Sequence, residues 1–251
     1  MLIHPTLQKL RTLHLSGMAE GLEEQLNLPD CQALSFEERL GLLVDRELTQ
    51  RDSQRLRLRL KQAGFAQSAT WEDLDLHSPR GLDKSLMATL GGGNWIGQHL
   101  NCLITGPTGA GKSYIAIALA HQACRAGYSA RYYRLSRLLQ ALHIARGDGS
   151  YAKLLKQLAR FDVLLIDDWG VAPMEAPAQR DMLEILDDRF NRKSTLVTSQ
   201  LPVSHWHEYL GDATLADAIL DRLVHNAYKV ELKGESMRKK ASPLTRKASK
   251  E

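Results

Sequence analysis

The stretch Gly106-Pro107-Thr108-Gly109-Ala110-Gly111-Lys112-Ser113 decides the fold of this 251-residue chain. It fits the pattern G-x-x-x-x-G-K-[ST], and it lies between an apolar run of strand type, Leu100–Thr105, and a helical stretch, Ser113–Arg125. Glycines let the backbone curl so that N–H groups face phosphate oxygens, and the helix N-terminus adds partial positive charge. All eight residues are therefore expected to bind ATP, with Lys112 on the β- and γ-phosphates and Ser113 on Mg²⁺.

From residue 100 onward, apolar runs of strand type alternate with helical stretches. This alternation predicts an α/β fold, in which helices cover both faces of a central parallel sheet in three layers. The expected strands are Leu100–Thr105, Ala130–Tyr133, Val163–Ile166, Thr195–Thr198 and Tyr228–Leu232, and the expected helices are Ser113–Arg125, Ser136–Ala145, Pro177–Phe190 and Leu215–Val224.

The segment that precedes this pattern has a different periodicity. Residues 1–63 are helical in pattern, with Ser35 and Glu38 as a capping box and Gly64 as a helix stop. The next stretch is polar and glycine-rich around a short helical piece near residues 82–90. We therefore expect a small all-α N-terminal domain that binds DNA or a partner at residues 1–66, a connector at 67–99, the α/β core at 100–238 and a basic, disordered tail at 239–251.

A second motif lies further along the core. The apolar strand Val163–Ile166 is followed by Asp167 and Asp168, as in the Walker B strand of P-loop ATPases. There the first acid contacts Mg²⁺ and the second polarises the attacking water as a general base. Ser199 and Gln200 follow the next expected strand, where either can orient the water or sense the γ-phosphate, and a simple turn is the alternative. Together the two motifs predict ATP hydrolysis as well as binding.

The net charge of +4 conceals strong segregation along the chain. Lys and Arg side chains gather in three islands, which are candidates for contact with the phosphates of a polynucleotide. The islands are residues 48–61 with a net charge of +4, residues 131–160 with +6 and residues 238–251 with +5, against −4 for residues 1–47 and −8 for residues 161–221.

The first two islands are where we expect DNA to lie. Arg51, Arg55 and Arg59 are four residues apart and share one helix face, which suits a DNA backbone; a solvated face is the alternative. Such backbone contacts give affinity without reading the base sequence. The candidate DNA contacts are Arg51, Arg55, Arg59, Lys61, Arg131, Arg134, Arg137, Arg146 and Lys153.

The cellular compartment is predicted from the cysteine spacing and from the membrane and export signals that the sequence lacks. Its three cysteines are odd in number and widely spaced, which favours free thiols in a reducing compartment. No apolar run approaches the roughly 18–20 residues that span a bilayer, and the N-terminus has no signal-peptide pattern. We therefore expect a cytoplasmic protein without a membrane partner.

These motifs resemble those of AAA+ ATPases of the DnaC-like clade, and over nearly the whole chain they are similar to the IstB-like transposition helper ATPases. The run from Trp206 to Arg238 is the most specific part of the similarity. The other parts are the pattern LHLSGMA at Leu13–Ala19, the basic stretch Arg51–Ala63 with Gly64-Phe65, the P-loop and Val163–Gly170.

The resemblance implies ATP-dependent assembly of a homo-oligomer, a ring or a spiral, on duplex DNA, with ATP between subunits and the element's transposase as partner. By position alone Arg222 is an ordinary solvated side chain, but the resemblance implies that it is an arginine finger acting in trans. The resemblance also implies that Arg238 is an arginine that contacts ATP in cis. The C-terminal lid domain that often carries such a residue is not evident in the sequence. The chain departs from the family pattern at Asp168, where Glu is usual, at Gln200, where Asn is common, and at Met237, where an aromatic is common.

The expected function is therefore that of a DNA-stimulated ATPase that helps a transposase to select and use target sites. The alternative is a DnaC-like replicative helicase loader, whose N-terminal domain binds a protein and needs no arginine stripe at residues 48–61. A third possibility is an ATP-binding switch that hardly hydrolyses.

Overall fold

The computed structural model describes residues 5–28, 31, 33–78, 80–234 and 237. The chain forms two compact units, residues 1–58 and residues 59–251, and helix α3 (Phe36–Ala63) begins in the first and ends in the second. Arg238, predicted to contact ATP, and the predicted basic tail at 239–251 lie outside the described residues. The predicted domain limits at residues 66, 99 and 238 stay predictions.

The first unit is held together where α2 (Ser16–Asn27) meets α3. No side chain of its own caps α2; instead the Glu47 carboxylate accepts hydrogen bonds from the N–H groups of Gly17 (2.7 Å) and Met18 (3.2 Å). A Cβ at Gly17 would lie 2.8 Å from the Cα of Glu47, so only glycine permits this approach. The unit also contains α1 (Pro5–Thr12), and the capping box of Ser35 and Glu38 is confirmed at the start of α3.

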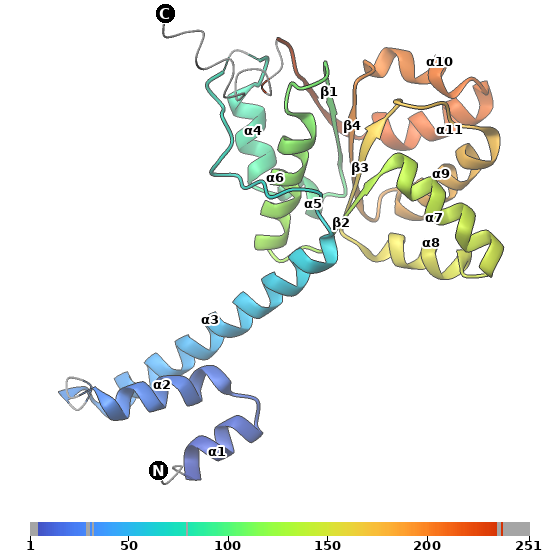
Figure 1. Ribbon diagram of the computed structural model, residues 1–251. Helices are drawn as coiled ribbons and strands as arrows, with labels where there is room; N and C mark the ends of the chain where they lie inside the picture. Colours follow the sequence, from blue (N-terminus) through green and yellow to red (C-terminus); the bar gives the residue numbers. More distant parts are fainter. Residues whose placement is uncertain (1–4, 29–30, 32, 79, 235–236, 238–251) are drawn as a thin grey trace, which may run out of the picture. The chain divides into compact units, whose positions relative to one another are not determined.

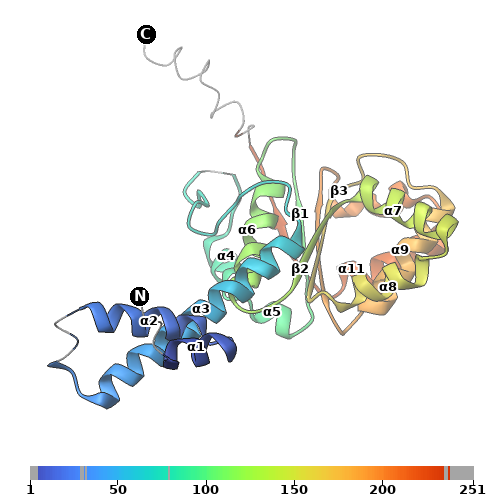
Figure 2. The same cartoon turned by 60° about the horizontal axis from the view of Figure 1, so that its bottom comes forward.

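The second unit is built on a five-stranded sheet in the order β2-β3-β4-β1-β5, with every neighbouring pair parallel. Helices α4 and α6 cover one face, and α7, α8, α9 and α11 cover the other (Figures 1 and 2). The predicted three-layer α/β fold is therefore confirmed. Its strands are β1 (Asn101–Thr105), β2 (Ala130–Arg134), β3 (Val163–Trp169), β4 (Ser194–Ser199) and β5 (Ala227–Glu231).

All five predicted strands and all four predicted core helices are present, with ends shifted by a few residues. Two further helices of the core, α8 and α10, were not among those expected. After β5 the described residues are 232–234 and 237, and they form no lid domain. The helices are α4 (Lys84–Gly91), α5 (Asn94–Gly97), α6 (Lys112–Arg125), α7 (Leu135–Asp148), α8 (Tyr151–Arg160), α9 (Ala176–Arg189), α10 (Trp206–Leu210) and α11 (Ala213–Val224).

The carboxyl ends of the strands form the edge on which the polar side chains gather. Here β3 pairs with β4 in register up to Ile166, opposite Val197, and again at Trp169, opposite Ser199. Two residues of β3 therefore face one residue of β4, which is a β-bulge at Asp167-Asp168. The bulge turns the backbone of Asp168 to a φ of 65° and separates the directions of two consecutive carboxylates.

Two of the three cysteines are buried, as expected of free thiols: Cys102 lies in β1 and Cys124 in α6. Burial raises the pKa of Cys102 to about 12 and that of Cys124 to about 11, so neither is a reactive thiolate at neutral pH. Within the described residues, no helix is both long and apolar enough to span a bilayer.

Candidate functional site

The glycine-rich loop leaves β1 and ends at the first turn of α6. Gly111 occupies the N-cap position of α6 with a φ of 95°, and no side chain caps this helix. The N–H groups of its first turn have no acceptor within the helix itself. Lys112 is buried and folds back along the loop, where its Nζ donates to the carbonyl oxygens of Gly106 (2.8 Å) and Pro107 (2.9 Å). The loop thus combines the N–H donors at a helix N-terminus with a cation, which suits a polyphosphate.

Asp167, in β3, accepts hydrogen bonds on its carboxylate from side chains of β2, β4 and α6. It is 3% exposed, and its Oδ1 accepts hydrogen bonds from the hydroxyls of Ser113 (2.7 Å) and Thr198, while Oδ2 accepts one from the hydroxyl of Tyr132 (2.9 Å). Burial, with the Asp167 charge next to it, raises the pKa of Tyr132 to about 12, so Tyr132 stays a hydrogen-bond donor at neutral pH. The predicted Mg²⁺ ligands Ser113 and Asp167 are thus adjacent.

Asp168, the second acid, has a different environment. Its side chain is 43% exposed and lines the pocket described below, because the bulge turns it away from Asp167. The Nε of Arg134, at the end of β2, lies 3.9 Å from its Oδ2. An exposed carboxylate beside a buried one separates the two roles predicted for this pair, metal ligand and water activator.

The two strand-tip candidates have different surroundings. The Gln200 Oε1 accepts a hydrogen bond of 2.7 Å from the Thr108 hydroxyl in the loop, and Gln200 lines the same pocket as Asp168. Ser199 is fully buried; its hydroxyl donates to the carbonyl of Trp169 (2.7 Å) and accepts from the N–H of Leu201 (3.0 Å). Gln200 is thus placed at the pocket, whereas Ser199 serves the turn that follows β4.

A pocket of about 550 Å³ joins these groups. Its lining includes Arg134, Asp168 and Gln200, which lie at or next to the carboxyl ends of strands β2, β3 and β4, and residues of the glycine-rich loop. Met237 also lines it, and its N–H donates to the carbonyl of Gly109 (2.9 Å). The remaining lining residues come from the connector before β1 and from α6, namely Gln67, Asp73, Asp75, Arg80 and Tyr114.

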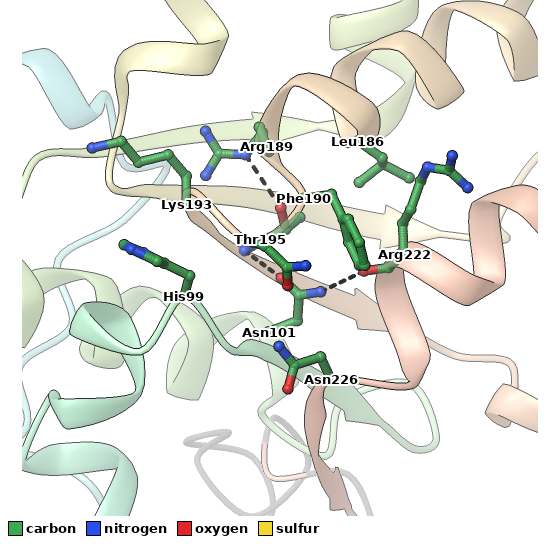
Figure 3. A pocket seen from close by; sticks show the side chains of 10 residues that line it. His99, Asn101, Leu186, Arg189, Phe190, Lys193, Thr195, Arg222 and Asn226 are labelled. Atoms are coloured by element: carbon green, nitrogen blue, oxygen red, sulfur yellow. Dashed lines mark hydrogen bonds between the residues drawn. The ribbon is translucent and has the colours of Figure 1, made fainter.

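Arg222 does not line this pocket. Its Nε pairs with Asp187 of α9, its Nη1 donates to the carbonyl of Ala218 (2.8 Å), and its own carbonyl accepts a hydrogen bond from Asn101 (2.8 Å), the first residue of β1 (Figure 3). The adjoining cavity holds only about 10 Å³, room for a single water molecule. Arg222 therefore lies at the amino end of β1, whereas the glycine-rich loop follows its carboxyl end.

The arginines predicted on α3 differ in their contacts. Arg51 pairs with Glu47 (2.6 Å), and Arg55, 65% exposed, pairs weakly with Asp52 (3.3 Å). Both line a groove of about 370 Å³ in the first unit. Arg59, in the second unit, instead donates its Nε to the Cys124 carbonyl (2.9 Å), so the stripe does not present three equivalent guanidinium groups. Lys61 is exposed. The other residues of the groove are His14, Ser16, Glu47, Gln50, Gln54 and Leu58.

Several basic residues of the second island have partners within the fold. Arg131 donates to the Gln62 carbonyl (2.7 Å) and lies over the Tyr133 ring, whereas Arg146 pairs with Asp181 and lies 3.8 Å from the centroid of the Tyr151 ring. Their cations therefore hold secondary-structure elements together. Arg137 is exposed on α7 and donates to Gln140 (3.1 Å).

One face of α8 carries the most open positive charge of this island. Lys153, Lys156 and Arg160 are exposed and line a shallow groove with Ala152 and Gln157. The spacing of three and four residues puts the three cations on one helix side. Of these only Lys153 was among the candidates drawn from the sequence, because α8 itself was not expected.

Among the site residues that the sequence did not single out are Tyr132 and Thr198, which bind Asp167, and Arg80, which lines the pocket beside the loop. Thr198 carried a signal, since it ends a predicted strand next to the Walker B strand. The other two carried none, because neither β2 packing against β3 nor the path of the connector is visible in local sequence.

Comparison with known proteins gives consistent results. The family model described as IstB-like ATP binding protein matches residues 8–245. An insertion sequence ATP-binding protein of Sinorhizobium fredii is 50% identical over 239 residues, covering 95% of this chain and 98% of that protein. The ATP-binding protein of insertion sequence IS1162 of Pseudomonas fluorescens is 55% identical, covering 81% and 89%. The crystal structure of the DnaC helicase loader is similar in fold, with a TM-score of 0.53 and 18% identity, covering 65% and 98%.

Proposed function

Because the chain belongs to the family of IstB-like ATP-binding proteins, of the DnaC-like AAA+ kind, we propose that it is a DNA-stimulated ATPase that assists transposition. It would form homo-oligomers on duplex DNA and help the transposase of its own insertion sequence to select and use target sites. The observation that carries the enzymatic part is the meeting of Lys112, Ser113, Asp167 and Asp168 at one end of the sheet.

ATP would lie along the pocket with its phosphates over the glycine-rich loop. The donor set fits Mg²⁺, because a hydroxyl and a carboxylate oxygen, both hard ligands, lie 2.7 Å apart at Ser113 and Asp167. Bound there, Mg²⁺ would neutralise charge on the phosphates. Lys112 would exchange the carbonyls of Gly106 and Pro107 for phosphate oxygens, which its flexible stem allows.

Hydrolysis requires a water molecule oriented toward the terminal phosphate. Asp168 would accept its proton, and Gln200, which accepts a hydrogen bond from Thr108 and lines the same pocket, would orient it. Aspartate is one methylene shorter than the usual glutamate, so we expect slow turnover. Tyr132 and Thr198 would keep the Asp167 carboxylate in one orientation throughout.

The position of Arg222 supports a role in trans. It lies at the amino end of β1, so it would reach ATP in a neighbouring subunit and not in its own. An arginine that neutralises transition-state charge typically contributes about 10³–10⁵ in rate. Its pairing with Asp187 would hold the side chain ready between α9 and α11.

Duplex DNA would contact the groove with Arg51 and Arg55 in the first unit and the α8 face in the second. The groove is lined by Arg51 and Arg55 together with the Glu47 carboxylate, and among the described residues the α8 face is lined by three cations and no carboxylate. An excess of positive charge on each surface suits sequence-independent phosphate contacts. Arg59, Arg131 and Arg146 would act mainly within the protein, since their guanidinium groups already have partners.

The test is phosphate release by the full-length protein with and without duplex DNA. We expect duplex DNA to stimulate release and Lys112→Ala to abolish it. Unstimulated release would contradict the DNA-linked function, and no release at all would favour an ATP-binding switch. A pull-down from cells that supply both proteins should retain the transposase; retention of the replicative helicase alone would favour a loader.

A further inference from the structure

Arg80 is a buried cation beside the glycine-rich loop. Only 7% of it is exposed. Its Nη1 donates to the carbonyl of Ala110 (3.2 Å) in the loop, and its Nη2 donates to the carbonyl of Asp75 (2.6 Å). Its Nε, equally buried, has no hydrogen-bond partner among the described residues. Two neutral carbonyls and one unused donor are a poor environment for a full positive charge.

The nearby Asp75 carboxylate does not compensate for the burial of the Arg80 charge. Burial lowers the pKa of Arg80, against the smaller opposite effect of the Asp75 charge. The Asp75 carboxylate is itself occupied, because it accepts hydrogen bonds from the Ser78 hydroxyl and from the N–H groups of His77 and Ser78. These hydrogen bonds lower the pKa of Asp75 to about 2, so it stays charged but is turned to its own loop.

The backbone fixes where Arg80 points. Its carbonyl accepts a hydrogen bond of 2.8 Å from the N–H of Lys233, just after β5. A Cβ at Gly81 would lie 2.9 Å from the carbonyl oxygen of Glu231, so this segment lies directly against the end of that strand. A Cβ at Gly111 would lie 2.7 Å from the Nη1 of Arg80, so the guanidinium group presses against the loop at the start of α6.

From this geometry we infer that Arg80 is a positioning residue of the ATP site, an inference that rests on the proposed function. By holding the Ala110 carbonyl, it fixes the peptide plane that also carries the Gly111 N–H, and so orients that donor at the start of α6 toward phosphate. The phosphates of a bound nucleotide supply the negative charge that the buried guanidinium otherwise lacks. ATP and ADP both carry the phosphates that this loop binds, so both depend on Arg80.

The experiment measures equilibrium binding of Mg-ATP and of Mg-ADP to the full-length protein. Arg80→Met is expected to weaken both nucleotides by about tenfold or more, because a charge-assisted contact is lost. Arg80→Lys keeps the positive charge but lacks the planar guanidinium with its several N–H donors. It is therefore expected to bind both nucleotides more tightly than Arg80→Met and more weakly than the wild type. Arg125→Met is the matched control: it releases Glu72 of the same connector from α6, away from the pocket, and should change affinity less than twofold.

A second readout separates positioning from a structural role. Saturating Mg-ATP should raise the unfolding temperature of Arg80→Lys and Arg80→Met by less than it raises that of the wild type. A merely structural residue would lower the unfolding temperature without nucleotide and leave the increase unchanged, and that outcome would overturn the inference. If Arg80→Met does not fold, Arg80→Lys gives the same comparison.

Failure of the inference differs from failure of the proposed function. Wild-type affinity in both Arg80 variants, with binding abolished by Lys112→Ala, would overturn the inference alone. Absence of ATP binding in the wild type, or binding that Lys112→Ala leaves intact, would overturn the ATP site and the inference together.

Discussion

Ser113 and Asp167 lie 54 positions apart in the chain and are joined by a hydrogen bond of 2.7 Å from hydroxyl to carboxylate. This contact links the first turn of α6 to the end of β3, across the strand β4 that lies between β1 and β3. It thereby sets the two oxygens that we propose as Mg²⁺ ligands side by side, and Thr198 and Tyr132 hold the Asp167 carboxylate further.

We expect Asp167→Asn to lower ATP turnover by about 100-fold, equivalent to about 2.7 kcal/mol in the barrier. The amide has the same shape as the carboxylate but no charge, so it loses the electrostatic attraction to Mg²⁺. Steady-state phosphate release measured over a range of Mg²⁺ concentrations checks this. Asp148→Asn, at the exposed last residue of α7, is the control and should behave like the wild type. Turnover within twofold of the wild type in Asp167→Asn would show that the metal lies elsewhere.

Two neighbouring residues should separate activity from stability. Gln200→Ala is expected to lower turnover by about tenfold at unchanged unfolding temperature, because it loses a group at the pocket. Ser199→Ala is expected to cost about 2 kcal/mol of unfolding free energy, because two hydrogen bonds worth about 1 kcal/mol each are lost, at nearly unchanged turnover. Phosphate release and thermal unfolding of both variants provide the measurement, and the reverse pattern would exchange the two assignments.

Mixed assemblies test the placement of Arg222. Arg222→Ala and Lys112→Ala should each be inactive alone, and mixing them should restore part of the activity, because one supplies an intact pocket and the other an intact arginine. Mixing Lys112→Ala with Asp167→Asn is the control and should restore nothing, since both changes affect the same side of the site. Equal activity in the two mixtures would contradict a contribution in trans.

Salt dependence tests the groove of the first unit. Replacing Arg51 and Arg55 with Ala should reduce the slope of log affinity for duplex DNA against log salt by up to about 1.8, given about 0.9 for each phosphate contact. Arg57→Ala removes equal charge per residue from a position roughly 200° around the helix from Arg55, so it should reduce the slope less. Binding titrations at four or more salt concentrations measure the slopes. Identical slopes for the double variant and the wild type would make the groove a solvated surface.

Glu47 should make the first unit sensitive to acid. Burial works to raise the pKa of Glu47, but hydrogen bonds from Arg51, Met18 and Gly17 outweigh it and hold the pKa below the usual value. Because the pKa of Glu47 is lower in the folded protein than in the unfolded chain, its carboxylate stabilises the fold fully at pH values above the unfolded-state pKa. This stabilisation is lost as the pH falls through the folded-state pKa. Glu47→Gln should therefore be less stable at pH 7 and lose less on acidification. Thermal unfolding at pH 7 and pH 4 checks this; parallel losses in both proteins would contradict it.

The sequence predicted those parts of the molecule that depend on neighbours in the chain. Alternation of apolar runs located every strand of the sheet, and the loop from Gly106 to Ser113 and the pair Asp167-Asp168 were recognisable because their chemistry requires consecutive residues. The bulge that separates the two carboxylates was not predictable, since it arises from pairing between β3 and β4.

Long-range partners account for most of what the sequence did not predict. Counting charges treated Arg59, Arg131 and Arg146 as free cations, yet their acceptors are the carbonyls of Cys124 and Gln62 and the carboxylate of Asp181. These acceptors lie 65, 69 and 35 positions away. Helix α8 was missed because its lysines were read as part of a basic island, although its leucines have helical spacing.

The glycine-rich loop and Arg222 lie at opposite ends of β1, so each molecule has two different surfaces for contact with its neighbours. With ATP shared as proposed, assembly is directional and the contact is heterologous, so a row of subunits can grow from either end. An open row always has one molecule whose pocket lacks a neighbour's arginine, whereas a closed ring has none. Activity per molecule would then rise with assembly length and level off, and the protein would work only as a member of a polar array.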